Sequence, residues 1–231
     1  AKAYICGLGF YEMYLNGERV GDQVLAPAVT NFDRRPLKKM LYFFDDQSNQ
    51  RVLYNTFDVT SLVQKAENTV GVLLGNGWYN QRDRTVEGCM WYDTPRLLCQ
   101  LEIEYTDGST ELVVTDDSWK TTTGPLLHDA IFTGEEYDAR LELDGWNRNG
   151  YKDSSWKKAL LVRAPKGSLH AQLAPHEKII RILQPVSCEQ KDDSTYWYAF
   201  PEMISGWAHI KVQGNAGDRI KLRFVGEEKN D

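Results

Sequence analysis

Short runs of alternating apolar and polar residues, separated by turn residues, dominate the chain. Residues 11–15 alternate in this way and run into Asn16-Gly17, a dipeptide that readily adopts the positive φ angles of a tight hairpin turn. Gly21-Asp22 follows as a second turn signal. The pattern predicts a strand, a two-residue turn and a returning strand near the start of the chain.

Two further hairpins are predicted downstream. Residues 97–105 form a strand of mixed burial that ends at Asp107-Gly108, and residues 111–115 are the expected partner. Residues 208–212 and 220–224 are expected to pair in the same way. Both pairs place a glycine-containing turn between two apolar runs.

Long segments of helical period are missing from the pattern. The best helical candidate is residues 58–63, where Asp58 or Thr60 could cap a first turn. Many short strands with Gly- and Asn-rich turns favour an all-β, antiparallel β-sandwich over a parallel sheet with crossover helices. Seven Trp and twelve Tyr agree with this prediction, because aromatic residues suit half-buried pleated surfaces.

A domain boundary is predicted near residues 160–174, where Pro- and Gly-containing segments interrupt the strand pattern. Residues 1–162 then form the sandwich, and residues 163–231 begin a second β-rich unit. The strands after the boundary are too few to close a sandwich, so the second unit is expected to be truncated. Both ends of the chain lie within or close to strand-like sequence, which predicts a piece excised from a longer protein.

Charge and hydropathy narrow the classes of partner. The formal net charge of −6 argues against a nucleic-acid backbone as partner. The richest basic stretch (Arg34, Arg35, Lys38 and Lys39) adjoins acidic residues and is interpreted as a solvated loop. No apolar run approaches the roughly 20 residues that a membrane helix needs. Residues 1–10 do not have the pattern of a secretion signal.

Four cysteines and four histidines show no spacing typical of a metal site. Cys6 and Cys99 lie in apolar strand-like runs, where buried free thiols are expected. A Cys89–Cys99 disulfide is the alternative, although the cysteine density is too low for a disulfide framework.

Several phrases, in order along the chain, resemble the N-terminal portion of bacterial α-L-rhamnosidases of glycoside hydrolase family 78. They cover roughly residues 3 to 160. The phrases are GLGFYEMYLNG (7–17), RVGD (19–22), LAP (25–27), NTFDVT (55–60), ENTV (67–70), LLGNGWY (73–79), GEEYDAR (134–140), GW (145–146) and SWK (155–157). The tail phrase ISGW (204–207) is similar to the start of the next domain, but AFPEM at 199–203 departs from the family's polar pattern.

This resemblance implies a jelly-roll-like sandwich similar to carbohydrate-binding modules, followed by the start of a concanavalin-like domain. In the family, an (α/α)6 barrel that follows these domains carries the catalytic carboxylates of an inverting hydrolase. The chain itself is then expected to be non-catalytic, with a rhamnose-containing glycan and the C-terminal catalytic domain of the same protein as partners. The parent is expected in the periplasm or outside the cell, with the cytoplasm as the alternative.

Five residues are candidates for contact with sugar: Asn76, Trp78, Tyr79, Trp91 and Tyr92. The aromatic rings could offer a flat face to a sugar ring, and the Asn76 amide supplies a donor and an acceptor. The alternative is that the aromatic residues pack in the core or against the sandwich edge and that Asn76 is a turn residue. The resemblance also raises calcium as a ligand near this turn, although Asn76 stands where the family often has Asp.

Glu135, Glu136, Asp138 and Arg140 form the densest charged motif. On an extended strand the side chains of Glu136, Asp138 and Arg140 share one face, which predicts a structural ion pair rather than catalysis. The alternative is a role in docking to the catalytic domain or at the edge of its sugar-binding site. Three hypotheses for the whole chain follow. The first is an accessory module that positions carbohydrate and braces a catalytic domain, the second is an autonomous calcium-dependent rhamnose-binding lectin-like module, and the third is a structural spacer.

Overall fold

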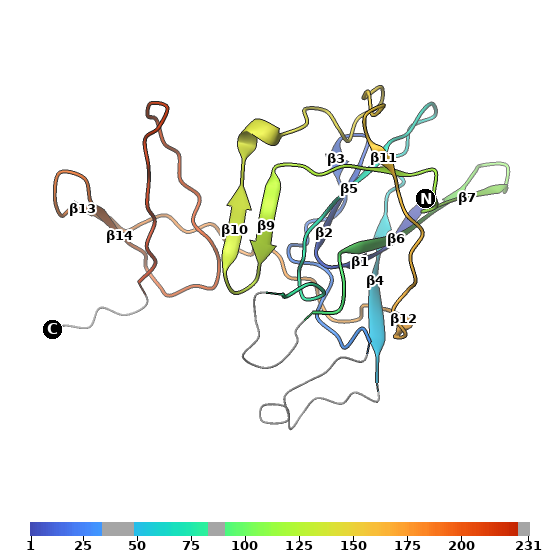
Figure 1. The fold of residues 1–231 in the computed structure, drawn as a ribbon, viewed down its shortest axis with the longest axis horizontal. Helices are drawn as coiled ribbons and strands as arrows, with labels where there is room; N and C mark the ends of the chain where they lie inside the picture. Colours follow the sequence, from blue (N-terminus) through green and yellow to red (C-terminus); the bar gives the residue numbers. More distant parts are fainter. Residues whose placement is uncertain (34–48, 83–90, 226–231) are drawn as a thin grey trace. The chain divides into compact units, whose positions relative to one another are not determined.

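The computed structural model describes residues 1–33, 49–82 and 91–225. Within these ranges it contains fourteen strands and a single short 3-10 helix, η1 (Ala139–Leu141) (Figure 1). The predicted all-β class is therefore confirmed. No helix in the described ranges is long and apolar enough to cross a membrane. The basic stretch at 34–39 and Cys89 lie outside the described residues.

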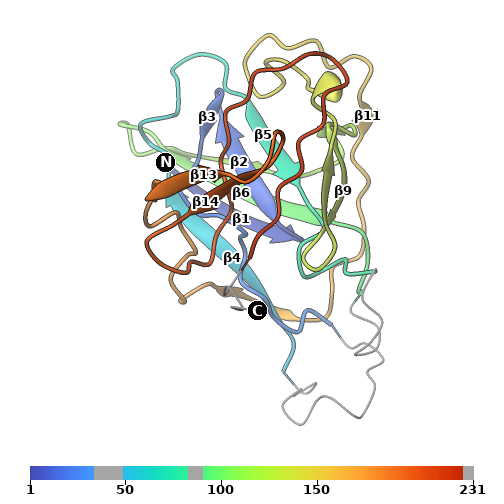
Figure 2. The same ribbon diagram turned by 90° about the vertical axis from the view of Figure 1, so that its left-hand side faces the viewer.

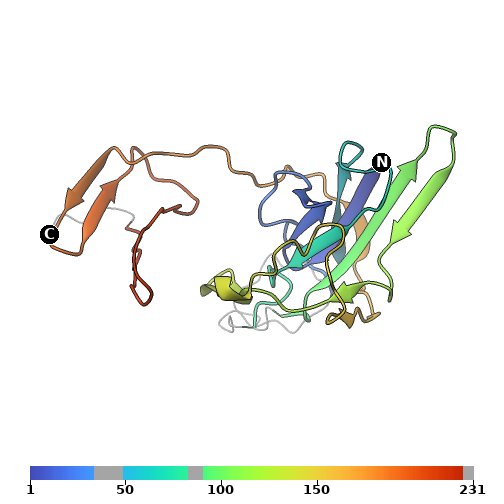
Figure 3. The ribbon, with the colours of Figure 1, turned by 90° about the horizontal axis from the view of Figure 1, so that it is seen from above.

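The larger sheet has five strands. Their spatial order is β12 (Ser168–Ala171), β4 (Arg51–Asp58), β1 (Lys2–Leu8), β6 (Arg96–Glu104) and β7 (Thr110–Val114). All neighbours are antiparallel except β12, which runs parallel to β4. The predicted hairpin of residues 97–105 and 111–115 is confirmed as β6 and β7, with Gly108 at a φ of 83° in the turn (Figure 3).

A second sheet of three strands, ordered β3 (Glu18–Arg19), β2 (Tyr11–Leu15) and β5 (Val70–Leu74), contains the other predicted hairpin. Asn16 and Gly17 have φ angles of 56° and 87°, the two positive values that a tight turn of this kind requires. Leu15 pairs with Glu18 directly across this turn. The prediction from Asn16-Gly17 is confirmed.

The main core lies between these two sheets, as expected of a β-sandwich. Alternate residues of β2 are buried, and on the facing sheet β6 buries Cys99 and Leu101, whereas β1 is buried continuously from Ile5 to Leu8. The buried members of this cluster are Ala3, Ile5, Tyr11, Met13, Leu15, Val20, Ala26, Val59, Cys99 and Leu101. The period-two alternation in the sequence thus determines which side chains face inward.

Three two-stranded ladders complete the structure. β8 (Lys120–Thr121) pairs with β11 (Lys157–Lys158), β9 (Leu126–Ala130) with β10 (Gly134–Tyr137), and β13 (Ser187–Gln190) with β14 (Tyr196–Ala199). The β9–β10 hairpin bears on the candidate site, because β9 reaches the end of β5.

The predicted helix at residues 58–63 is wrong. The Asp58 carboxylate accepts hydrogen bonds from the backbone N–H and the hydroxyl of Thr60, at 2.9 and 2.6 Å. This local bonding favours a turn over a longer helix. Val59 is fully buried in the core, which holds the segment as a single turn after β4.

The described chain divides into two compact units, Ala1–Ile179 and Ile180–Asp231, and the domain boundary at residues 162–163 stays a prediction. Residues 163–179 belong to the first unit because β12 lies beside β4 and because Gln172 enters the buried polar network of Asn55. The Pro and Gly residues of this segment suggest a linker in the sequence, whereas in the structure the segment forms an edge of the sandwich.

In the second unit, the β13–β14 hairpin is the main ordered element among the described residues (Figure 2). The predicted strands at 208–212 and 220–224 are wrong, since the structure assigns no ladder to either segment. Their side chains are exposed throughout. Their apolar side chains pack against no other described element, and a strand pair with an unpacked apolar face is marginal in water.

Candidate functional site

The turn that follows β5 is held against the end of β1. The backbone N–H of Gly75 donates to the carbonyl of Phe10 at 2.8 Å. Gly77 has a φ of 46°, and a Cβ at this position would press on the backbone of Phe10. The backbone N–H of Asn80 donates to the carbonyl of Asn76 at 3.1 Å and closes one helical turn. These three contacts fix the direction in which residues 76–80 present their side chains.

Asn76 connects this turn to β9. Its backbone N–H donates to Asp129 Oδ1 at 2.7 Å, and its side-chain Nδ2 donates to the carbonyl of Asp129 at 2.8 Å. Its Oδ1 accepts from Asn80 Nδ2 at 2.6 Å. The amide predicted to contact sugar therefore takes part in structural bonds through both of its polar atoms.

The two aromatic residues of the turn lie in different environments. Tyr79 is 2% exposed, and its ring packs in a second core cluster with Phe32. Burial raises the pKa of its hydroxyl. The Tyr79 ring is therefore not accessible to a sugar. Trp78 is only partly buried and meets the ring of Phe132 edge-on at a centroid distance of 5.7 Å.

The structure brings the second predicted segment beside the first. The backbone N–H of Tyr92 donates to the carbonyl of Tyr79 at 3.0 Å, and Trp91 forms an isolated antiparallel bridge with Asn80. The rings of Tyr79 and Tyr92 stack, with an interplanar angle of 11°. Three of the five predicted residues, Tyr79, Trp91 and Tyr92, therefore take part in these two backbone contacts, and Trp78 precedes Tyr79 in the chain.

Trp91 is the most accessible of the candidate aromatic residues, with 38% of its surface exposed. The guanidinium carbon of Arg82 lies 4.5 Å from the centre of the Trp91 ring. This is a cation–π arrangement, in which the positive charge meets the negative face of the ring. Arg82 itself is exposed.

Three residues of this region, Asn80, Arg82 and Asp129, were not predicted. Asn80 stands four positions after Asn76, a spacing that brings two side chains together on one helical turn, so the sequence carried a weak signal for it. Asp129 is in a strand 53 positions away from Asn76. Only the packing of β9 against the end of β5 reveals its role.

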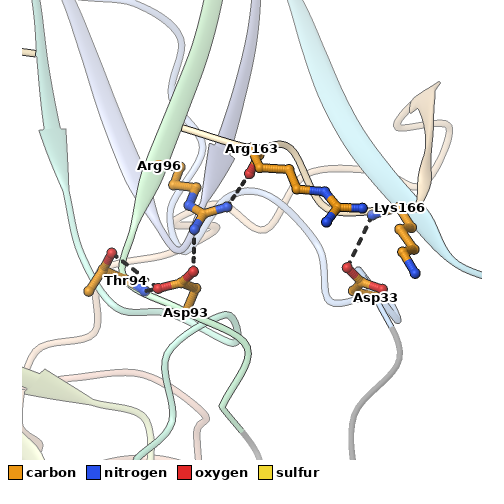
Figure 4. Close-up of polar contacts among 6 residues, drawn as sticks. All are labelled: Asp33, Asp93, Thr94, Arg96, Arg163 and Lys166. Atoms are coloured by element: carbon orange, nitrogen blue, oxygen red, sulfur yellow. Dashed lines mark hydrogen bonds and ion pairs between the residues drawn. The ribbon is translucent and has the colours of Figure 1, made fainter. Parts of the chain in front are cut away.

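A second polar cluster lies at the start of β6 (Figure 4). The Arg96 guanidinium donates to the Asp93 carboxylate and to the carbonyl of Arg163. Nearby, the backbone N–H of Lys166 donates to Asp33 Oδ2 at 3.2 Å (Figure 4). The two Arg96 bonds connect Arg163, on the segment that leads to β12, with Asp93, which follows Trp91 and Tyr92.

The charged motif is a turn rather than a continuous strand. β10 ends at Tyr137, and Asp138 caps η1 by accepting from the backbone N–H of Arg140. The Arg140 guanidinium also forms an ion pair with Asp138 at 2.6 Å. These hydrogen bonds lower the pKa of Asp138 to about 2. Glu136 remains in β10, so the expected shared face of three charged residues is interrupted.

Two of the thiols, Cys6 and Cys99, are buried. Burial raises the pKa of Cys6 and of Cys99 to about 12, which keeps both thiols protonated at neutral pH. Cys99 is a free, buried thiol in the structure. Across the described ranges, no group of three or more His, Cys, Asp or Glu side chains is placed to hold a metal ion.

The fold thus defines an all-β sandwich module with an aromatic and amide-rich turn at the end of β5. The family model "Alpha-L-rhamnosidase N-terminal domain" matches residues 1–43 and 44–181. The chain belongs to this family. The match ends close to the division between the two units at Ile179.

Curated relatives cover nearly the whole chain. An α-L-rhamnosidase of Formosa agariphila is 33% identical over 227 residues, which are 96% of this chain and 22% of the relative. One from Alteromonas sp. (strain LOR) is 31% identical over 231 residues, 97% of this chain and 23% of the relative. The chain therefore spans less than a quarter of the length of either relative.

Solved structures give the same picture. The α-L-rhamnosidase of Dictyoglumus thermophilum matches with a TM-score of 0.71 and 38% identity, over 85% of this chain and 20% of that structure. The Streptomyces avermitilis α-L-rhamnosidase, solved in complex with L-rhamnose, matches with a TM-score of 0.71 and 31% identity over 84% of this chain and 18% of its own.

Proposed function

We propose that this chain is a non-catalytic accessory region of an α-L-rhamnosidase, which positions carbohydrate and braces a catalytic domain. The observation that supports it is the match to whole α-L-rhamnosidase structures over 84–85% of this chain but only 18–20% of theirs. Under this proposal, terminal α-L-rhamnosyl residues are hydrolysed by the remaining four-fifths of such an enzyme.

The charged motif supports a role outside catalysis. A general acid at neutral pH needs a raised pKa, whereas the pKa of Asp138 is lowered to about 2 by its bonds to Arg140. An inverting hydrolase also needs two carboxyl groups roughly 6.5–9.5 Å apart across a bound sugar. The Asp138–Arg140 pair instead stabilises the turn between β10 and η1.

For the carbohydrate, the proposal assigns the contact surface to Trp91 and Trp78. Trp91 is 38% exposed, Trp78 is partly buried, and both are positioned by the turn at Asn76–Asn80. An aromatic face of this kind packs against the C–H side of a pyranose ring. Asn76 and Tyr79 then act as supports for this surface, because the first is bonded to Asp129 and the second is buried.

A second candidate function is a calcium-dependent rhamnose-binding module. One observation favours it: Asn80 Oδ1 is buried and accepts no hydrogen bond within the described part of the chain. The carboxylate of Asp129 and the amide of Asn76 lie at the same turn. Carboxylate and amide oxygens are the hard donors that calcium prefers, although calcium sites usually contain more than one carboxylate. Bound there, calcium would supply a positive charge for sugar hydroxyls.

Calorimetric titration of the chain with L-rhamnose separates these functions. It is done with calcium, with a chelator, and with D-mannose as a control sugar. Heat with L-rhamnose that Trp91→Ala abolishes supports carbohydrate positioning, and loss of that heat in chelator supports the calcium-dependent module. No heat under any condition removes both and leaves a structural spacer. Turnover of an aryl α-L-rhamnoside by the pure chain, abolished by one substitution, would overturn the non-catalytic assignment.

A further inference from the structure

Three Asn-Gly dipeptides occur in the chain: Asn16-Gly17, Asn76-Gly77 and Asn149-Gly150. Such a dipeptide can deamidate without an enzyme. The backbone nitrogen of the glycine attacks the asparagine Cγ, ammonia leaves, and water opens the cyclic imide to aspartate or isoaspartate. Glycine favours this reaction because it has no Cβ to hinder ring closure or to restrict the backbone. The structure distinguishes the three dipeptides by how firmly each is held.

The first dipeptide is held through the asparagine amide and crowded at the glycine. Asn16 Nδ2 donates to the carbonyl of Leu62 at 2.9 Å, and Asn16 Oδ1 accepts from the backbone N–H of Thr69 at 2.9 Å. Gly17 lies under the side chain of Arg148, whose Cγ would be 2.9 Å from a Cβ on this glycine. Ring closure between Gly17 and Asn16 therefore requires these contacts to open first.

The second dipeptide is held in the same two ways. The amide of Asn76 is bonded through both of its polar atoms, to Asp129 and to Asn80. Gly77 is buried, and a Cβ on it would lie 2.6 Å from the backbone nitrogen of Phe10. A buried backbone of this kind can rearrange only through local unfolding, so ring closure is slow here as well.

Asn149-Gly150 is the exposed dipeptide. No described atom lies within 4 Å of a Cβ built on Gly150, so its backbone has room to turn towards Asn149. The Asn149 amide makes two bonds, both at the surface. Its Nδ2 donates to the carbonyl of Glu67 at 2.7 Å, and its Oδ1 accepts from the Thr69 hydroxyl at 2.5 Å. Exposed contacts of this kind open at a lower free-energy cost than buried ones.

These two bonds hold residues 143–150 close to the sheet that contains β2 and β5. Trp146 lies against Gly71 of β5, where a Cβ would be 2.7 Å from its ring, and it meets the Tyr14 ring of β2 edge-on at 5.6 Å. A carboxylate at position 149 has no N–H to donate and would turn a negative charge towards the Glu67 carbonyl. Deamidation therefore removes a bond that keeps this loop closed.

We propose that Asn149 is a spontaneous deamidation site, and that its conversion to aspartate or isoaspartate releases residues 143–150 from β2 and β5. The reaction needs only water, so the product accumulates with the age of the protein. It adds one negative charge to a chain whose formal net charge is −6. The inference does not depend on the proposed carbohydrate-positioning function.

Peptide mapping by mass spectrometry of the full chain, incubated in warm and mildly alkaline buffer, measures the three dipeptides in one experiment. Asn149 is expected to convert at least about tenfold faster than Asn16 and Asn76, because the latter two must wait for local unfolding. In concentrated urea the three rates should converge. Equal rates in the folded chain, or a ranking that persists in urea, overturns the proposal.

Amide hydrogen exchange of residues 143–150 tests the release of the loop. Asn149→Asp should raise their exchange rate about fivefold, which corresponds to the loss of one hydrogen bond. Asn147→Asp is the matched control, since it adds the same charge to the same loop, and it should leave the exchange rate unchanged. The deamidated chain, separated by its additional negative charge, gives the same measurement without a substitution. Exchange that rises in both variants or in neither overturns the release of the loop.

Discussion

Asn76 and Asp129 are joined twice, although 53 positions separate them in the sequence. Asp129 Oδ1 accepts from the backbone N–H of Asn76 at 2.7 Å, and the Asn76 side chain donates to the Asp129 carbonyl at 2.8 Å. The turn after β5 is thereby fixed to the β9–β10 hairpin. The orientation of Trp78 and the bridge to Trp91 depend on this same turn.

Asn76→Ala and Asp129→Ala should each lower the free energy of unfolding by about 1–2 kcal/mol, because each leaves a partly buried partner without its hydrogen bond. The double variant should lose about the sum of the two, because each substitution removes a different side-chain-to-backbone hydrogen bond, and urea denaturation of all four proteins measures this. Asp129→Asn is the matched control, since its amide oxygen still accepts from the Asn76 backbone N–H. A double variant that loses much less than the sum would show that one bond forms only when the other is present.

Gly9→Ala should destabilise the chain far more than Gly150→Ala. Both glycines have positive φ, 107° and 80°, so both variants carry the backbone strain of a left-handed alanine, about 1–2 kcal/mol. A Cβ on Gly9 would also lie far inside contact distance of the Gly75 carbonyl oxygen, whereas one on Gly150 meets nothing. Urea midpoints that fall equally for the two variants would contradict the close approach of the Gly9 and Gly75 backbones.

Tyr11→Phe should cost about 1–3 kcal/mol of stability. The Tyr11 hydroxyl donates to Asn55 Oδ1 at 2.6 Å inside the core, and its loss leaves a buried carbonyl without that donor. Burial also raises the pKa of Tyr11, which keeps the hydroxyl a donor at all ordinary pH. Tyr4→Phe removes an exposed bond to Glu102 and should change the unfolding free energy by less than about 0.5 kcal/mol.

A chain that ends at residue 179 should unfold at nearly the same temperature as the first unit of the whole chain, whereas one that ends at residue 162 should be much less stable. The shorter chain loses β12 from the edge of β4 and loses Gln172, whose Oε1 accepts from the backbone N–H of Ala28 at 3.0 Å. Calorimetric unfolding of the two truncated chains provides the comparison. Equal melting temperatures would show that residues 163–179 contribute nothing to the sandwich.

Stability should fall in acid as a set of turn carboxylates is protonated. Hydrogen bonds from nearby Ser, Thr or Arg lower the pKa of each below the ordinary value of 3.8, and that of Asp138 to about 2. The residues are Asp58, Asp107, Asp116, Asp138 and Asp192. Because the folded pKa is the lower one, their contribution is complete above about pH 4 and is lost as the pH falls towards 2.

Urea midpoints measured between pH 2 and pH 5 check this dependence. The Asp107→Asn, Asp116→Asn variant should show a shallower fall than the unmodified chain, since two of the titrating groups are gone. An unchanged pH profile in that variant would assign the acid sensitivity to other carboxylates.

Much of the fold could be predicted because it rests on local chemistry. Asn16-Gly17 readily takes the two positive φ angles of its turn, and the alternation at 11–15 selects the buried face of β2. Residues 58–63 show the limit of such reasoning, because Asp58 can cap a helix or close a turn equally well. Burial of Val59 decides between the two, and burial is a tertiary property.

The sequence by itself determined the all-β class, the first hairpins and the aromatic candidates near Asn76, because these depend on φ preferences, side-chain alternation and residue type within a few positions. Only the tertiary structure decided that Tyr79 is buried, that Trp91 is exposed, and that Asp129 and Arg82 join the site. Those facts depend on which segments of the chain come into contact in the folded sandwich. Such contacts form when whole sheet faces are buried against each other, and no short stretch of sequence encodes them.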